Sequence, residues 1–152
     1  MRRLVMRCGI AMGLAVGIFM GADAPRNDAA PSGDALHGVW QLSSGEADGK
    51  VLSETQLKGG KLVIDGARYA VTLAKIGTIT GTQTLGAAQE LKTIDITDES
   101  GSHAGKTCLG IYELNENEFR VVFASPGGAR PSKFETAPDS GQWMHVWKRI
   151  KP

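Results

Sequence analysis

The residues of this chain that could do chemistry are few and widely spaced. The three histidines are His37, His103 and His145. His37 and His145 fall near the two ends of the folded region, so the sheet of a closed barrel could bring them together. A zinc site needs three or four ligands, and no spacing of cysteine and histidine here supplies them. We therefore expect solvated or structural histidines and no metal site.

The carboxylates form no evident acid–base pair. Asp95 lies between Ile94 and Ile96, and this alternation predicts a solvent-facing side chain. Asp98 and Glu99 follow without the dense oxygen spacing of a calcium loop. The serines lack the strand-turn-helix context of a nucleophile elbow, and the glycine pairs lack the helix and Lys-Ser/Thr of a phosphate loop. We expect no catalytic residue and no cofactor.

The segment Arg130-Pro131-Ser132-Lys133-Phe134 has two interpretations. In the first, Arg130 presents its guanidinium at a barrel mouth to a carboxylate or phosphate, with Lys133 beside it, while Tyr112 and His145 complete the candidate ligand-binding residues. In the second, which we favour, Arg130 pairs with a carboxylate on a neighbouring strand and Phe134 fills the core. An enzyme, a hydrolase or isomerase using His145, Tyr112 and Arg130, is the alternative to a binding role.

The elements that must position these residues are strands. Apolar side chains recur at every second residue from Leu36 onward, which is typical of half-buried antiparallel strands, and turn residues separate the runs. Among these turn signals we count Gly86. The pattern predicts about eight strands, near residues 37–44, 60–65, 68–75, 78–84, 91–97, 106–114, 118–124 and 142–150.

Eight strands with mostly short connections favour an all-β, antiparallel up-and-down barrel, because closure removes exposed strand edges. A β-sandwich is the alternative, and periodicity alone does not distinguish the two. Ser53-Glu54-Thr55-Gln56-Leu57 has a capping residue followed by Gln, so it predicts a helical turn that forms a lid or crossing loop. A short extended segment at residues 132–136 is expected to pair at an edge.

The first residues have the form of a secretory leader. Basic residues precede an apolar run from Cys8 to Met20, and small residues follow at Gly21-Ala22-Asp23-Ala24. We expect residues 1–24 to be a signal peptide, 25–35 a disordered tether, and 36–151 the barrel domain. The predicted location is extracytoplasmic, in the periplasm, at the cell surface or secreted, with a membrane attachment only if the leader is not cleaved.

The net charge and the cysteine content indicate which partners and which covalent cross-links to expect. Removal of residues 1–24 takes three of the 17 basic and one of the 16 acidic residues, which leaves a net charge near −1. A nucleic-acid partner would want a concentrated basic face, so none is expected. Cys108 is then the only cysteine, so it cannot form an internal disulfide, and we expect it to be buried.

Four blocks of this sequence carry a resemblance. They are Leu36-His37-Gly38-Val39-Trp40, the run from Gly105 to Tyr112, Arg130-Pro131-Ser132-Lys133-Phe134, and Trp147-Lys148-Arg149. Together they resemble a family of uncharacterised extracytoplasmic domains, lipocalin-like in fold and abundant in planctomycete bacteria. The resemblance implies a lipocalin-like barrel in which Trp40 closes one end and Arg149 lies over it. Since the family has no established activity, the resemblance implies no reaction.

These expectations favour a non-enzymatic exported barrel that binds a small apolar or amphipathic molecule or a cell-surface protein. An eight-stranded barrel either holds a small ligand or is filled by its own side chains. The bulky candidates for the interior favour a filled lumen and a surface role. They are Trp40, Leu62, Ile64, Tyr69, Val71, Ile111, Phe119, Val121, Phe123 and Trp147.

Overall fold

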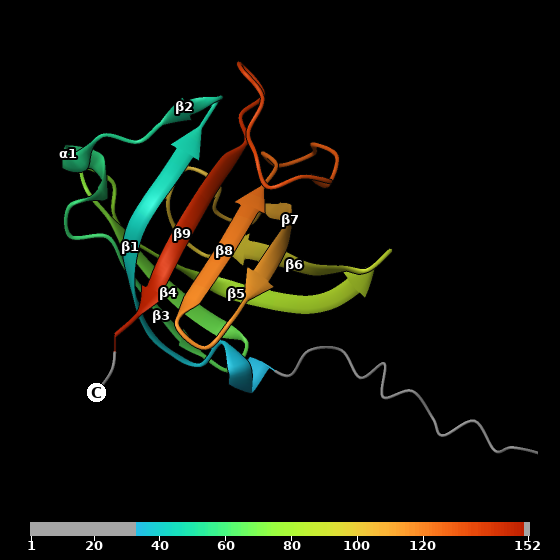
Figure 1. The fold of residues 1–152 in the computed structure, drawn as a ribbon, viewed down its shortest axis with the longest axis horizontal. Helices are drawn as coiled ribbons and strands as arrows, with labels where there is room; N and C mark the ends of the chain where they lie inside the picture. Colours follow the sequence, from blue (N-terminus) through green and yellow to red (C-terminus); the bar gives the residue numbers. More distant parts are fainter. Residues whose placement is uncertain (1–32, 151–152) are drawn as a thin grey trace, which may run out of the picture.

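A computed structural model describes residues 33–150 of the chain, and its strands wind into one closed barrel (Figure 1). Eight strands, β1 and β3 to β9, pair antiparallel in chain order, and β9 pairs back to β1. The elements are η1 (Gly33–Ala35), β1 (Gly38–Ala47), β2 (Lys50–Val51), α1 (Glu54–Leu57), β3 (Lys61–Asp65), β4 (Arg68–Leu73), β5 (Gly77–Ala88), β6 (Leu91–Asp98), β7 (Thr107–Leu114), β8 (Glu118–Phe123) and β9 (Trp143–Arg149).

The all-β, up-and-down barrel is therefore confirmed, and the sandwich alternative is wrong. All eight long strands lie near their predicted positions, and the fold is consistent with a lipocalin-like barrel. Closure is made by the pairing of Trp40 with Arg149 and of Leu42 with Trp147, interrupted by a bulge at Ser43. The extra strand β2 is a two-residue addition to the end of β1.

Two local expectations are wrong. Gly86 is not a turn but lies inside β5, opposite Thr93, so β5 and β6 form a longer hairpin than the sequence suggested. Residues 132–136 form no strand. The described residues begin with η1 at Gly33, within the segment 25–35 that the sequence assigned to a tether. The predicted signal peptide and most of the predicted tether lie outside the described residues.

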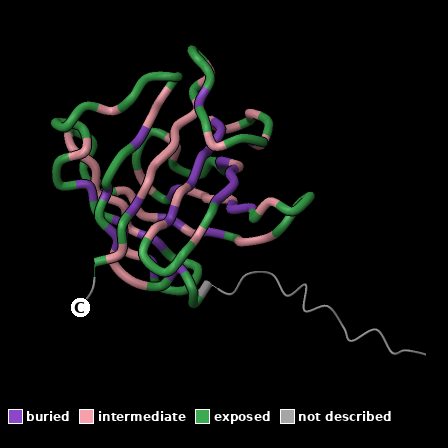
Figure 2. Tube along the Cα trace, in the orientation of Figure 1, coloured by how far each residue is buried: buried purple, intermediate pink, exposed green. Residues whose placement is uncertain are grey.

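The core follows from the alternation of side chains along each strand. Most of the buried positions lie on the strands, and the connections are largely exposed (Figure 2). The one α-helix of the described part of the chain, α1, begins with the capping box expected at Ser53 and Gln56. Within residues 33–150, no helix is long and apolar enough to cross a membrane.

Candidate binding cavity

One end of the barrel is closed by Trp40. Its ring is fully buried, and its indole nitrogen donates a hydrogen bond to the Leu36 carbonyl at 2.9 Å. The guanidinium carbon of Arg149 lies 4.1 Å from the centre of the Trp40 ring, the stacked arrangement that the resemblance implies. Gly38 has φ of 133°, and a Cβ there would lie 3.1 Å from the Arg149 guanidinium, so glycine leaves the room this stack needs.

Arg149 also ties together three segments at this end. Its guanidinium donates hydrogen bonds to the carbonyls of Ala35, His37 and Glu116 at 2.8, 2.9 and 3.0 Å. Such a planar fork of donors is a property of arginine and not of lysine. The N-terminal turn, the β7–β8 turn and the last strand are therefore held against the tryptophan plug by one side chain.

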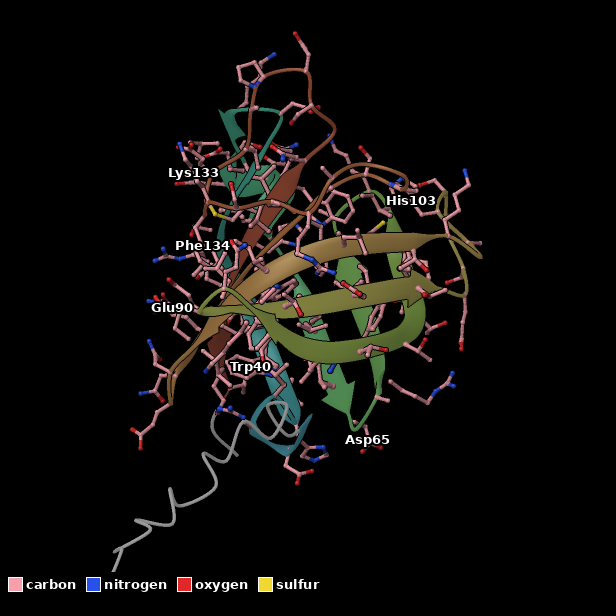
Figure 3. All side chains as sticks on the ribbon, turned by 90° about the vertical axis from the view of Figure 1, so that its right-hand side faces the viewer. Trp40, Asp65, Glu90, His103, Lys133 and Phe134 are labelled. Carbon is pink, nitrogen blue, oxygen red and sulfur yellow. The ribbon has the colours of Figure 1, made fainter. Side chains whose placement is uncertain are left out.

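The lumen above Trp40 is hollow. It contains a cavity of about 380 Å³, so the expectation of a lumen filled by its own side chains is wrong. Residues at the opposite end from Trp40 also line it: Gln56 of α1, Ile76 of the β4–β5 turn, and Ser102 and His103 of the β6–β7 loop. Figure 3 shows Trp40 and His103 toward opposite ends of the barrel. The volume is at the small end of the range for small-molecule sites.

One wall of the cavity, on β9, is aromatic. Trp143, His145 and Trp147 alternate inward along this strand and line the cavity, and the His145 and Trp147 rings meet edge to face at 5.4 Å. Burial among these apolar groups lowers the pKa of His145 to about 4. His145, predicted as a ligand-binding residue, thus lies in the cavity and is neutral near pH 7.

The wall across the lumen carries three polar side chains. β5 is four strands away from β9 in either direction around the barrel. There Tyr69 on β4 and Asp98 on β6 both pair in register with Gly81 on β5, and Gln83 lies two residues further along β5 on the same face. Tyr69, Gln83 and Asp98 all line the cavity, although each is less than 9 % exposed.

The Tyr69 hydroxyl donates a hydrogen bond to a carboxylate oxygen of Asp98. Burial, and then this carboxylate, raise the pKa of Tyr69 far above its usual value, so the phenol stays protonated. A Cβ on Gly81 would lie 2.4 Å from the Tyr69 hydroxyl and from the Thr97 carbonyl. Glycine at this position is therefore what lets the tyrosine reach the aspartate.

The sequence contained a signal for Asp98 that our interpretation missed. Asp98 continues the inward alternation of Ile94 and Ile96, which places its carboxylate on the apolar face of β6. From the sequence we considered it only together with Glu99, as part of a calcium loop. Glu99 instead points outward and pairs with Arg68 at 2.8 Å.

Arg130 does not lie at the barrel mouth. Its guanidinium donates hydrogen bonds to Asp95 and to the Gly110 carbonyl, both at 2.7 Å. Since Ile94 and Ile96 face the cavity, Asp95 points away from it, and this pair lies on the outer wall. The first interpretation of Arg130 is wrong in its location, and the geometry matches the ion pair of the second.

The rest of that segment also lies outside the lumen. Lys133 is exposed and lies 3.8 Å from Glu135, while Phe134 packs on the outward-pointing Arg120 at 5.8 Å and does not fill the barrel core (Figure 3). Arg130 and Phe134 thus lie over the outer face of the barrel. Val122 is fully buried although it points away from the lumen.

Tyr112 packs in the core near the closed end. It is 2 % exposed and meets Phe119 edge to face at 5.8 Å, and burial raises the pKa of its hydroxyl. In the sheet register Val121 lies between Tyr112 and His145. Because Arg130 is on the outer wall, the trio proposed for a hydrolase or isomerase is not assembled in one place.

The remaining histidines and the cysteine have structural surroundings. His37 lies at the closed end, 3.5 Å from Asp65, whereas His145 pairs with Gly45 near the other end, so the two do not meet. The sulfur of Cys108 is 4.0 Å from His103, and the cysteine is buried as expected. Burial raises the pKa of this thiol to about 11. No cluster of three metal-ligating side chains occurs within residues 33–150.

Comparisons with protein-family models, with curated proteins and with solved structures gave no match to this chain. The barrel and its cavity are therefore the observations on which function must be argued.

Proposed function

We propose that this chain is a non-enzymatic binding module that holds a small apolar or amphipathic molecule inside its barrel. The observation that carries the proposal is the cavity of about 380 Å³, walled by apolar and aromatic side chains with a few polar groups on one side. This combination is typical of small-molecule sites, in which apolar walls supply affinity and a few polar groups supply orientation.

The mouth of the cavity fits this role. Ile76 lines the cavity and yet is 65 % exposed, and Val51 next to α1 is 79 % exposed. Apolar side chains at the rim would give an apolar ligand a continuous path from the surface to the lumen. The closed end, sealed by Trp40 and Arg149, would prevent passage through the barrel.

We also propose that the domain works outside the cytoplasm, as a member of the lipocalin-like extracytoplasmic family that it resembles. The support is the leader-like sequence from Met1 to Ala24 and the blocks described above. Expression in a bacterial host followed by fractionation tests it. Mature protein in the periplasmic fraction, with a mass that lacks the leader, is expected; full-length protein in the cytoplasm would contradict export.

Fluorescence titration with N-phenyl-1-naphthylamine, which is uncharged at neutral pH and brightens in apolar surroundings, tests the cavity. Val71→Phe would place a larger side chain in the lumen, and Thr72→Phe would place the same side chain on the outer face of the same strand. We expect saturable binding to the wild type and to Thr72→Phe, and at least about tenfold weaker binding to Val71→Phe.

The titration contradicts the proposal if no probe binds the folded wild type, or if both phenylalanine variants bind it as the wild type does. Native mass spectrometry of protein purified from its own host is the companion measurement. A small molecule that copurifies with the wild type and is lost from Val71→Phe would identify the natural occupant.

A further inference from the structure

The charge of the cavity lining has one sign. Among residues 33–150, Asp98 is the only acidic side chain that lines it, and no lysine or arginine does. His145, on the facing wall, is neutral near pH 7 because burial lowers its pKa to about 4. The other cavity-lining histidine, His103, lies at the mouth, next to Trp143. The inner part of the lumen therefore offers one carboxylate in apolar surroundings.

This carboxylate is incompletely paired. Asp98 is 8 % exposed, and Tyr69 is the one side chain that hydrogen-bonds it among residues 33–150. No basic side chain of that range forms an ion pair with it, in contrast to Asp95 with Arg130 and Glu99 with Arg68. A carboxylate has about four acceptor sites, so one phenol leaves most of them unused.

A buried charge without a partner is costly, and proteins normally pair such groups. The neighbouring residues nevertheless accommodate Asp98. Because Gly81 has no side chain, it leaves the space in which the Tyr69 hydroxyl reaches the Asp98 carboxylate. Because Tyr69 and Asp98 both line the cavity, their unused hydrogen-bonding capacity faces the place where a ligand would lie.

We infer that the cavity selects small amphipathic amines, whose ammonium group would pair with Asp98 while the apolar body lies against the tryptophan wall of β9. This inference rests on the proposed binding function and names its ligand class. A charge-assisted hydrogen bond in low dielectric is stronger than a neutral one, so a protonated amine would gain more binding free energy from Asp98 than an alcohol would. A carboxylate such as a fatty acid would meet a like charge and be excluded.

Competition with bound N-phenyl-1-naphthylamine at pH 7 tests the inference, with three competitors of equal length: hexylamine, hexanol and hexanoate. We expect hexylamine to displace the probe at a concentration about tenfold or more below that of hexanol, because hydrogen bonds to charged groups are the stronger class. Hexanoate should be the weakest of the three.

Asp98→Asn keeps the shape and removes the charge, so it should abolish the preference for hexylamine over hexanol. Asp95→Asn is the matched control, since it makes the same change in the same strand on the outer wall, and it should retain the preference. If Asp98→Asn does not fold, Tyr69→Phe replaces it: loss of the phenol leaves the carboxylate with more free acceptors, and the amine preference should persist or grow.

The ranking of the three competitors on the unmodified protein is decisive without any variant. Equal displacement by all three, or stronger displacement by hexanoate, would overturn the amine inference and leave the binding proposal standing. Failure of the probe itself to bind would overturn both.

Discussion

Acidification from pH 7 to pH 5 should destabilise this barrel through His145. The folded protein holds its pKa at about 4, against 6.5 for the free side chain, because the ring lies among apolar groups. Between pH 6.5 and pH 4, His145 binds a proton in the unfolded chain but not in the folded chain. Stability is therefore complete above about pH 6.5 and falls as the pH falls toward 4.

The size of this effect follows from the two pKa values. The full shift corresponds to about 3 kcal/mol, of which about 2 kcal/mol is already lost at pH 5. Both figures are upper limits, because the ring borders a cavity that water can enter. Since a domain of this kind has a total stability of about 5 to 15 kcal/mol, the loss is large enough to measure.

Urea denaturation followed by tryptophan fluorescence at pH 5, 6, 7 and 8 measures it. His145→Gln is neutral in both states, so its free energy of unfolding should change less between pH 7 and pH 5 than that of the wild type. His37→Gln is the matched control, because the His37 side chain is 61 % exposed at the closed end. It should keep the wild-type pH dependence.

Parallel curves for the wild type and His145→Gln between pH 7 and pH 5 would refute the reasoning. They would mean that the ring is hydrated in the folded state and that its burial in apolar surroundings is not real. The loss attributed to His145 can be separated from that of Glu46, whose pKa is lowered from 4.5 by hydrogen bonds from Thr136 and which therefore destabilises the fold only at lower pH.

Three further predictions concern single side chains. Arg149→Lys should lower the free energy of unfolding in urea by about 2 kcal/mol, because lysine keeps the charge but cannot bond three carbonyls at once; an unchanged midpoint would contradict this. Arg130→Ala should lower the melting temperature, by the equivalent of about 1 kcal/mol for a half-exposed ion pair, without changing probe binding; normal stability with lost binding would restore Arg130 as a site residue. Cys108 should resist a thiol reagent at pH 8 in the native protein and react once unfolded in urea, since its thiol is buried with a pKa of about 11; rapid native labelling would show that the strand opens.

The strands could be predicted because alternation is a local property. The residues of β8, Phe119 to Phe123, show it within a few positions, and their inward side chains follow directly. The hollow lumen could not be predicted in this way. Whether Val71 and Trp147 touch across a barrel depends on its radius, which is set jointly by all eight strands, and the same bulky residues can line a space or fill it.

The candidate site, too, could be predicted from the sequence only in part. His145 and the Trp40–Arg149 stack were identified from the sequence, the latter through a resemblance and not through periodicity. Arg130 was misplaced because residues 124–142 have no periodicity to say which side of the barrel they cross. The inward position of Asp98 could have been predicted, since Asp98 continues the spacing of Ile94 and Ile96. An acidic residue at a strand end is, however, more often a surface residue.

The tie that Arg149 makes has a consequence for how the chain is synthesised. It joins the last strand to backbone groups 112 and 114 residues earlier, so β1 has no partner on that side until nearly the whole domain has left the ribosome. Until then β1 and β8 present open edges that other chains can pair with. A nascent chain stalled before Trp143 would therefore be an open, aggregation-prone sheet. A chaperone that binds this protein would be needed between the emergence of β1 and that of β9.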